Sequence, residues 1–146
     1  MRLSLTFAAG QIQSAADVYN DAPNPLSERA RPGMSDQNLP LEIDCRSVKT
    51  RLDAGEPLVL LDCREANEYD FVRLDSARLV PMSELPQRVG ELDELRDAEI
   101  VVYCHHGVRS RQVANWLRGQ GFTQVQSLAG GIDRWTLEID ATLPRY

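Results

Sequence analysis

One short segment carries the side chains best suited to chemistry, and it lies between an apolar run and an amphipathic stretch. Its residues, in chain order, are Cys104, His105, His106, Gly107, Val108, Arg109 and Ser110. The apolar run at residues 100–103 predicts a buried strand, and the stretch that begins at Ser110 predicts a helix. The free N–H groups at a helix start favour a thiolate over a thiol. Cys104 is therefore the candidate nucleophile.

The sequence around Cys104 favours the binding of a small anion. The chain has a net charge of −6, yet no Asp or Glu occurs from residue 100 to residue 132, where Arg109, Arg111 and Arg118 lie. Gly107 supplies the backbone freedom with which a turn directs successive N–H groups inward. Four residues separate Cys104 from Arg109, and so tight a ring favours the transfer of one sulfur atom over that of a phosphate. An inert buried cysteine is the alternative.

Short apolar runs alternate with amphipathic stretches along most of the chain. Strands are predicted at residues 41–43, 58–61, 78–80, 100–103 and 125–128, and helices at 44–54, 83–90, 110–119 and after Gly131. This alternation predicts an α/β fold, in which an open, mostly parallel sheet carries helices on both faces. Such sheets bind ligands beyond the carboxyl ends of their strands, which is where Cys104 is expected.

Composition argues against several classes of function. With 16 basic and 22 acidic residues, the chain is unsuited to a phosphate backbone, so we expect no nucleic-acid partner. No apolar stretch reaches the ~18–20 residues of a membrane-spanning helix. The three cysteines, Cys45, Cys63 and Cys104, are an odd number with no C-x-x-C pair, which argues against a disulfide framework and a structural zinc site. A reducing compartment stays open, and we expect the cytoplasm. His105 and His106 are the two histidines, and without a regularly spaced third ligand we predict no metal.

The first 38 residues differ in composition from the rest. Three prolines among polar residues predict a flexible or disordered N-terminal extension over residues 1–38, followed by a folded domain over residues 39–146. Residues 1–16 also bear a weak likeness to a secretory signal, with one arginine before a short apolar run. Met34 is an alternative natural start, in which case the residues before it are an artefactual extension.

Three motifs in chain order resemble those of single-domain rhodaneses. They are D-x-R-x-x-x-E-[FY] at Asp62, Arg64, Glu68 and Tyr69; C-x-x-G-x-R-[ST] at Cys104, Gly107, Arg109 and Ser110; and L-x-G-G-x-x-x-W at Leu128, Gly130, Gly131 and Trp135. The resemblance extends from about residue 41 to residue 135. One segment departs from it, because residues 72–77 (VRLDSA) match the usual G-H-I-x-G-A only at Leu74 and Ala77. The departure concerns the local backbone and not the cysteine loop.

The resemblance implies a rhodanese-like sulfurtransferase that needs no metal and no organic cofactor. The Cys104 thiolate would take the outer sulfur of a small anion such as thiosulfate and hold it as a persulfide. A thiol or a protein acceptor would then remove that sulfur. Arg109 would orient the loop or the sulfonate of the donor, while His105 and His106 would add hydrogen-bond donors or tune the charge.

Four further residues are expected to support the loop. Asp62 and Arg64 are interpreted as a structural ion pair, with a pocket-facing Arg64 as the alternative. Gly130 and Gly131 would allow close approach of the backbone to the loop. Cys63 is interpreted as a packing residue, with a resolving thiol as its alternative.

Two other functions remain open at this stage. A rhodanese-like module that carries sulfur only when it is docked to a partner protein would show the same motifs. Phosphatases and arsenate reductases share the architecture, but they generally carry C-x5-R, one residue longer than the spacing here.

Overall fold

The computed structural model describes residues 39–146. The predictions for residues 1–38, namely a flexible extension, an export signal in residues 1–16 and an alternative start at Met34, lie outside the described residues. Within residues 39–146, no helix is both long enough and apolar enough to cross a membrane.

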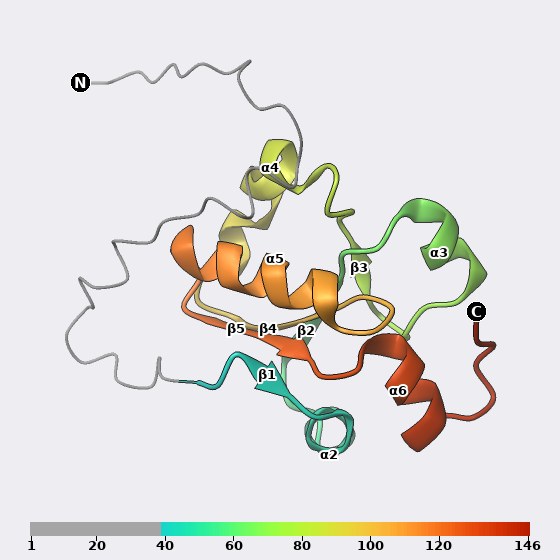
Figure 1. Ribbon diagram of the computed structural model, residues 1–146. Coiled ribbons are helices and arrows are strands. Elements are labelled where there is room, and N and C mark those ends of the chain that lie inside the picture. The colour runs from blue at the N-terminus through green and yellow to red at the C-terminus, as the bar shows by residue number, and fades with distance from the viewer. Residues whose placement is uncertain (1–38) are drawn as a thin grey trace, which may run out of the picture.

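Five strands form one sheet in the order β1-β5-β4-β2-β3 (Figure 1). Their bounds are Glu42–Ile43 (β1), Leu58–Asp62 (β2), Arg78–Leu79 (β3), Glu99–Tyr103 (β4) and Gln124–Leu128 (β5). Each lies where an apolar run predicted a strand. Every neighbouring pair is parallel, so the sheet, predicted to be mostly parallel, is wholly parallel among the described residues.

Helices cover both faces of this sheet, as predicted for an α/β fold (Figure 1). Their bounds are Cys45–Asp53 (α2), Ala66–Phe71 (α3), Leu85–Arg88 (α4), Val108–Gly119 (α5) and Gly131–Glu138 (α6), with a 3₁₀ helix at Val89–Leu95 (η4). The core cluster on one face takes its helical residues from α4, η4 and α5, and the cluster on the other face from α2 and α6.

The pleat of the central strand β4 divides the core between these two faces. Ile100 and Val102 join the cluster beneath α5, whereas Val101 and Tyr103 join the cluster of α2 and α6. Burial on both faces explains the unbroken apolar run in the sequence. The same alternation places Cys104 on the α5 side, where it is only 1% exposed.

The register of β2 and β4 brings two cysteines to the same edge of the sheet. Asp62 and Tyr103 are partners at the ends of these strands. The N–H of Cys63 continues the pairing by donating to the carbonyl of Tyr103 at 3.1 Å. Cys63 and Cys104 therefore leave the sheet side by side at its carboxyl edge.

Three helical segments differ from their predictions. Helix α3 was not predicted, because none of its residues is buried and it has no apolar period. Helix α5 begins at Val108, two residues before the predicted Ser110, which tightens the cysteine loop. The helix predicted at residues 83–90 is the short α4, which continues as η4. In η4 the apolar side chains recur every third residue, at Val89, Leu92 and Leu95, and this spacing suits a 3₁₀ helix.

The segment that departs from the rhodanese pattern keeps its two matching positions in the core. Leu74 and Ala77 are both buried, and the N–H of Leu74 donates to the Tyr103 hydroxyl at 3.1 Å. Ser76 has a φ of 68°, a left-handed conformation at the position where the pattern has glycine. The departure therefore places backbone strain at Ser76.

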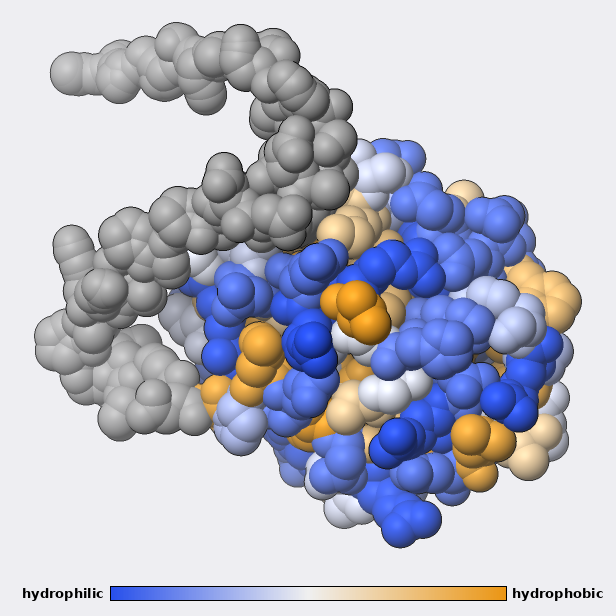
Figure 2. All heavy atoms as spheres, in the orientation of Figure 1, coloured by the Kyte–Doolittle hydropathy of each residue, from blue (hydrophilic) through white to orange (hydrophobic). Residues whose placement is uncertain are grey.

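Hydrophilic side chains cover most of the face seen in Figure 2, and hydrophobic ones are scattered among them. The large hydrophobic side chains most exposed among the described residues are Phe71, Val108, Leu137 and Tyr146. Val108 opens α5 and is 62% exposed. The rings of Phe71 and Tyr146 meet edge to face, with centroids 5.8 Å apart. This contact brings the end of the described chain against α3.

Candidate active site

The loop between β4 and α5 wraps around the sulfur of Cys104. The backbone N–H of Gly107 donates to Sγ at 3.1 Å, and that of Ser110 donates at 3.3 Å. Gly107 adopts a φ of 104°, which a residue with a side chain rarely takes, so glycine is needed for this bend. Two N–H groups directed at one atom form a small anion site, as the sequence predicted.

Ser110 adds a hydroxyl to this anion site. Its Oγ lies 3.5 Å from Sγ of Cys104 and 2.7 Å from Oγ of Ser127, and both serines are fully buried. Because Ser127 is able to donate its proton to Ser110, the Ser110 proton is available for a Cys104 thiolate. Ser127, which lies within the predicted fifth strand, was not among the candidate site residues.

Cys63 supplies a further donor that the sequence interpretation missed. Its thiol lies close enough to Cys104 to act as a donor to the thiolate, and this interaction, together with burial, raises the pKa of Cys63 well above its ordinary value. The pKa of Cys104 falls to about 5. The hydrogen bond from Cys63 is the largest cause, burial opposes the change, and the donors of Ser110 and Gly107 add to it. At neutral pH Cys104 is therefore a thiolate, and Cys63 is the neutral partner that stabilises it.

Arg109 points at a carboxylate. Its two terminal nitrogens lie 3.0 Å from the two oxygens of Glu68 on α3, a bidentate pair. These hydrogen bonds lower the pKa of Glu68 to about 2. This geometry fits the predicted loop-orienting role of Arg109. A contact with the sulfonate of a donor stays a prediction.

Asp62 and Arg64 form a buried ion pair with no exposed surface. The Arg64 guanidinium donates from Nε to Oδ1 at 2.9 Å and from Nη2 to Oδ2 at 2.6 Å. It also donates to the carbonyl of Val72 at 2.6 Å and to the hydroxyl of Tyr146 at 2.9 Å. Arg64 thus serves as a tie between segments, in keeping with the interpretation of a structural pair.

The two glycines before α6 allow this helix to lie directly on the loop. A Cβ at Gly131 would come within 2.3 Å of the His105 carbonyl oxygen and 2.6 Å of the Cys104 carbonyl oxygen. Those same carbonyls accept from the N–H groups of Asp133 at 3.0 Å and Ile132 at 2.9 Å. Gly130 has a φ of 82°, so its conformation also suits glycine. The predicted close approach is therefore observed.

His105 lies in a stack of three rings. Its imidazole stacks on His106 with centroids 3.8 Å apart and on Tyr146 with centroids 3.9 Å apart. The Tyr146 hydroxyl donates to Glu68 at 2.7 Å. Tyr146 thus touches both the cysteine loop and the carboxylate that holds Arg109. Its role was not foreseen, because these contacts join residues far apart in the sequence.

The fold and the site define a class of protein: an α/β domain that holds a cysteine thiolate in a loop between a strand and a helix. Within that class, the sequence matches the family described as Rhodanese-like domain over residues 44–138. The chain belongs to the rhodanese-like domain family, and the resemblance inferred from the three motifs is confirmed.

Known relatives include enzymes of sulfur transfer. The chain is similar to the adenylyltransferase and sulfurtransferase MOCS3-1 of Zea mays, with 30% identity over 135 residues that cover 89% of this chain and 29% of the maize protein. It is also similar to a sulfurtransferase of Allochromatium vinosum, with 36% identity over 94 residues that cover 64% of this chain and 86% of that protein. The chain spans 29% of the length of that maize protein, 28% of a second one, MOCS3-2, and 50% of the putative sulfur carrier protein YrkF of Bacillus subtilis.

A solved structure supports the fold. The crystal structure of a rhodanese-related protein from Thermoplasma volcanium matches with a TM-score of 0.60 and 28% sequence identity. The match covers 67% of this chain and 92% of that chain. The single α/β domain described here is thus a rhodanese fold.

Proposed function

We propose that this protein transfers sulfane sulfur from a small anionic donor, such as thiosulfate, to a thiol-containing acceptor through a persulfide on Cys104. The observation that carries the proposal is the Cys104 sulfur, which accepts from two backbone N–H groups and lies beside the thiol of Cys63. A sulfur atom so surrounded is a thiolate at neutral pH and is able to act as a nucleophile.

The reaction proceeds in two displacements at sulfur. The Cys104 thiolate attacks the outer sulfur of thiosulfate; a new S–S bond forms, the S–S bond of the donor breaks, and sulfite leaves with the electron pair. A thiolate acceptor then attacks the outer sulfur of the persulfide, and Cys104 leaves as a thiolate. The acceptor is a small thiol or the cysteine of a partner protein.

The loop stabilises the negative charge on sulfur in both steps. The N–H groups of Gly107 and Ser110 stabilise the thiolate before the first step and the persulfide after it. Arg109 holds the loop against α3 through Glu68. All three cysteines of the chain are free, which suits a reducing compartment such as the cytoplasm.

A sulfur-carrier module that acts only with a partner is the second candidate, and one observation favours it. Cys104 is 1% exposed, so an acceptor thiol reaches a sulfur held on it only when the loop moves. Docking of a partner on the loop would supply that movement. In that case the persulfide forms, but the isolated chain turns over slowly.

Steady-state transfer of sulfur from thiosulfate to cyanide distinguishes these candidates. The enzyme proposal predicts turnover by the wild type, loss of turnover in Cys104→Ser and retention in Cys45→Ala, whose thiol is buried away from the loop. Turnover that survives in Cys104→Ser contradicts the proposal. Persulfide formation without turnover selects the carrier.

A further inference from the structure

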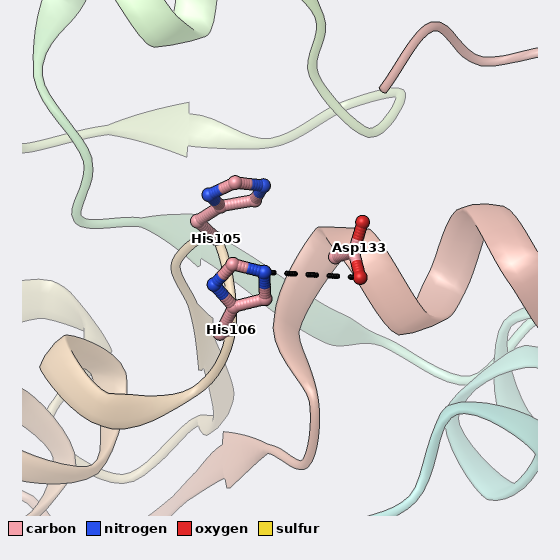
Figure 3. Close-up of side chains that lie close together, drawn as sticks. All are labelled: His105, His106 and Asp133. Atoms are coloured by element: carbon pink, nitrogen blue, oxygen red, sulfur yellow. Dashed lines mark ion pairs between the residues drawn. The ribbon is translucent and has the colours of Figure 1, made fainter. Parts of the chain in front are cut away.

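A second group of reactive side chains begins one residue after Cys104. Among the described residues, His105, His106 and Asp133 form a group of three potential metal ligands whose ligand atoms all lie within 4.8 Å of one another. Figure 3 shows the two imidazole rings one above the other, both facing the carboxylate at the start of α6. The mechanism proposed above does not use this carboxylate.

The fold supplies the third ligand that the sequence pattern lacked. Asp133 is remote from the histidines in the chain, so no regular spacing reveals it. The main chain nevertheless holds the three together, because the N–H of Asp133 donates to the carbonyl of His105 at 3.0 Å. The neighbouring bond from Ile132 to Cys104, at 2.9 Å, fixes the same contact between loop and helix. The spacing of the group is thus set by backbone structure.

The protonation pattern of His105 suits a metal ligand. Its Nε2 is buried and has no hydrogen-bond partner, the one such buried side-chain nitrogen or oxygen in the part of the chain that the structure describes. The main chain of Tyr146 raises the pKa of His105, which burial and His106 lower, and because Nε2 is unpartnered we assign this interaction to Nδ1. A histidine that donates from one ring nitrogen to the main chain presents the lone pair of the other, as metal-bound histidines do.

We propose that His105, His106 and Asp133 bind a divalent transition-metal ion, for which Zn²⁺ is the best match. Two imidazoles and a carboxylate are a ligand set that Zn²⁺ accepts, with a fourth position left for water. A tetrahedral ion with bonds of ~2.0–2.1 Å needs ligand atoms about 3.3 Å apart. His106 Nε2 lies 3.8 Å from Asp133 Oδ2, and the His106 side chain is 62% exposed. To bind an ion, the exposed His106 ring must turn out of its stack on His105, and the ligand atoms, now within 4.8 Å of one another, must draw together.

Arg145 is the competitor for this site. It donates to the two oxygens of Asp133 at 2.9 and 3.3 Å, so a metal ion must displace it from the carboxylate. The Arg145 side chain is 52% exposed and is therefore able to turn into solvent, whereas Asp133 is only 15% exposed and stays in place. Arg145 therefore lowers the metal affinity without blocking the site.

Isothermal titration of the full chain with Zn²⁺ tests the proposal in a Cys104→Ser background, which removes the reactive thiolate as a ligand. The result expected is one ion per chain. In that background, His106→Gln and Asp133→Asn bind at least about tenfold more weakly, since each removes one ligand. Arg145→Gln keeps all three ligands and binds Zn²⁺ at least as tightly as its parent.

Three outcomes overturn the proposal: no binding by the Cys104→Ser parent, equal affinity in His106→Gln, or loss of binding in Arg145→Gln. His106 is exposed, so its replacement leaves the core intact, and circular dichroism checks the fold of each variant. The chain has two histidines, and the nitrogen resonances of both imidazoles must shift when Zn²⁺ is added. Because the readout is binding, the result is independent of whether the protein transfers sulfur.

Discussion

The sulfur of Cys104 is both buried and ionised, and the residues around it explain how a buried charge is stabilised. Burial alone raises the pKa of a thiol, because a charge is costly away from water. Here the thiol of Cys63 and the donors of Ser110 and Gly107 outweigh that cost and hold the pKa of Cys104 at about 5. Hydrogen bonds are the main cause of this lowering, and Arg109 also interacts with Cys104 through its charge.

Cys63 is the residue whose replacement tests this explanation. Cys63→Ala removes a donor to the thiolate, so the pKa of Cys104 rises and less thiolate is present in acid. We expect the rate of alkylation by iodoacetamide at pH 5 to fall about tenfold, since a hydrogen bond to a charged group is worth ~1.5–3 kcal/mol. In the wild type the rate falls as the pH drops through about 5.

Cys63→Ser is the matched control, because its hydroxyl is still able to donate to Cys104. Its rate profile against pH should stay close to that of the wild type. If Cys63→Ala and Cys63→Ser give the same profile as the wild type, the thiol of Cys63 is a packing group only, as the sequence interpretation had it.

At the scale of secondary structure, the sequence predicted the strands that are buried and missed a helix that is not. Strands β2, β4 and β5 are buried enough to give apolar runs in the sequence, and the loop predicted to hold the nucleophile Cys104 follows β4 in the structure. Helix α3 has no apolar run or period in the sequence, since none of its residues is buried. Its signal was local instead: Glu68, three residues after Glu65, accepts the Glu65 N–H at 3.1 Å and caps the helix start.

The contact between the cysteine loop and α6 is tested at Gly131. Gly131→Ala would place a methyl group against the main chain of His105, at 2.3 Å from its carbonyl oxygen. We expect a loss of about 1–3 kcal/mol in the free energy of unfolding, as for an overpacked site. Urea denaturation measures it.

Gly55→Ala is the comparison variant for this loss. Gly55 also has a positive φ, 78°, but a Cβ there meets nothing within 4 Å. Its loss should therefore be smaller and limited to backbone strain. Equal losses in the two variants would show that the close packing of loop and helix contributes nothing.

At the scale of the whole molecule, one buried arginine ties together segments that lie far apart in the sequence. Arg64 contacts Asp62 at the end of β2, the main chain of Val72 after α3 and the hydroxyl of Tyr146. The motif predicted the ion pair, because both residues belong to it. The link to Tyr146 was not predictable, because it depends on where the chain runs after α6.

The buried pair is expected to matter for stability far more than the exposed pairs. Asp62→Ala leaves the Arg64 charge buried without its partner, and we expect a loss of about 3–5 kcal/mol in the free energy of unfolding. Asp53→Ala removes the exposed pair with Lys49 and should cost no more than about 0.5 kcal/mol. Chemical denaturation of both variants gives the comparison, and similar values would contradict this assignment.

The mass of the intact protein after exposure to thiosulfate alone tests the central claim most directly. The account predicts a gain of ~32 Da, one sulfur atom, in the wild type and in Cys45→Ala, and no gain in Cys104→Ser. Addition of a thiol should return the wild type to its original mass. A wild type that gains no mass, or a Cys104→Ser variant that gains ~32 Da, would contradict the persulfide on Cys104.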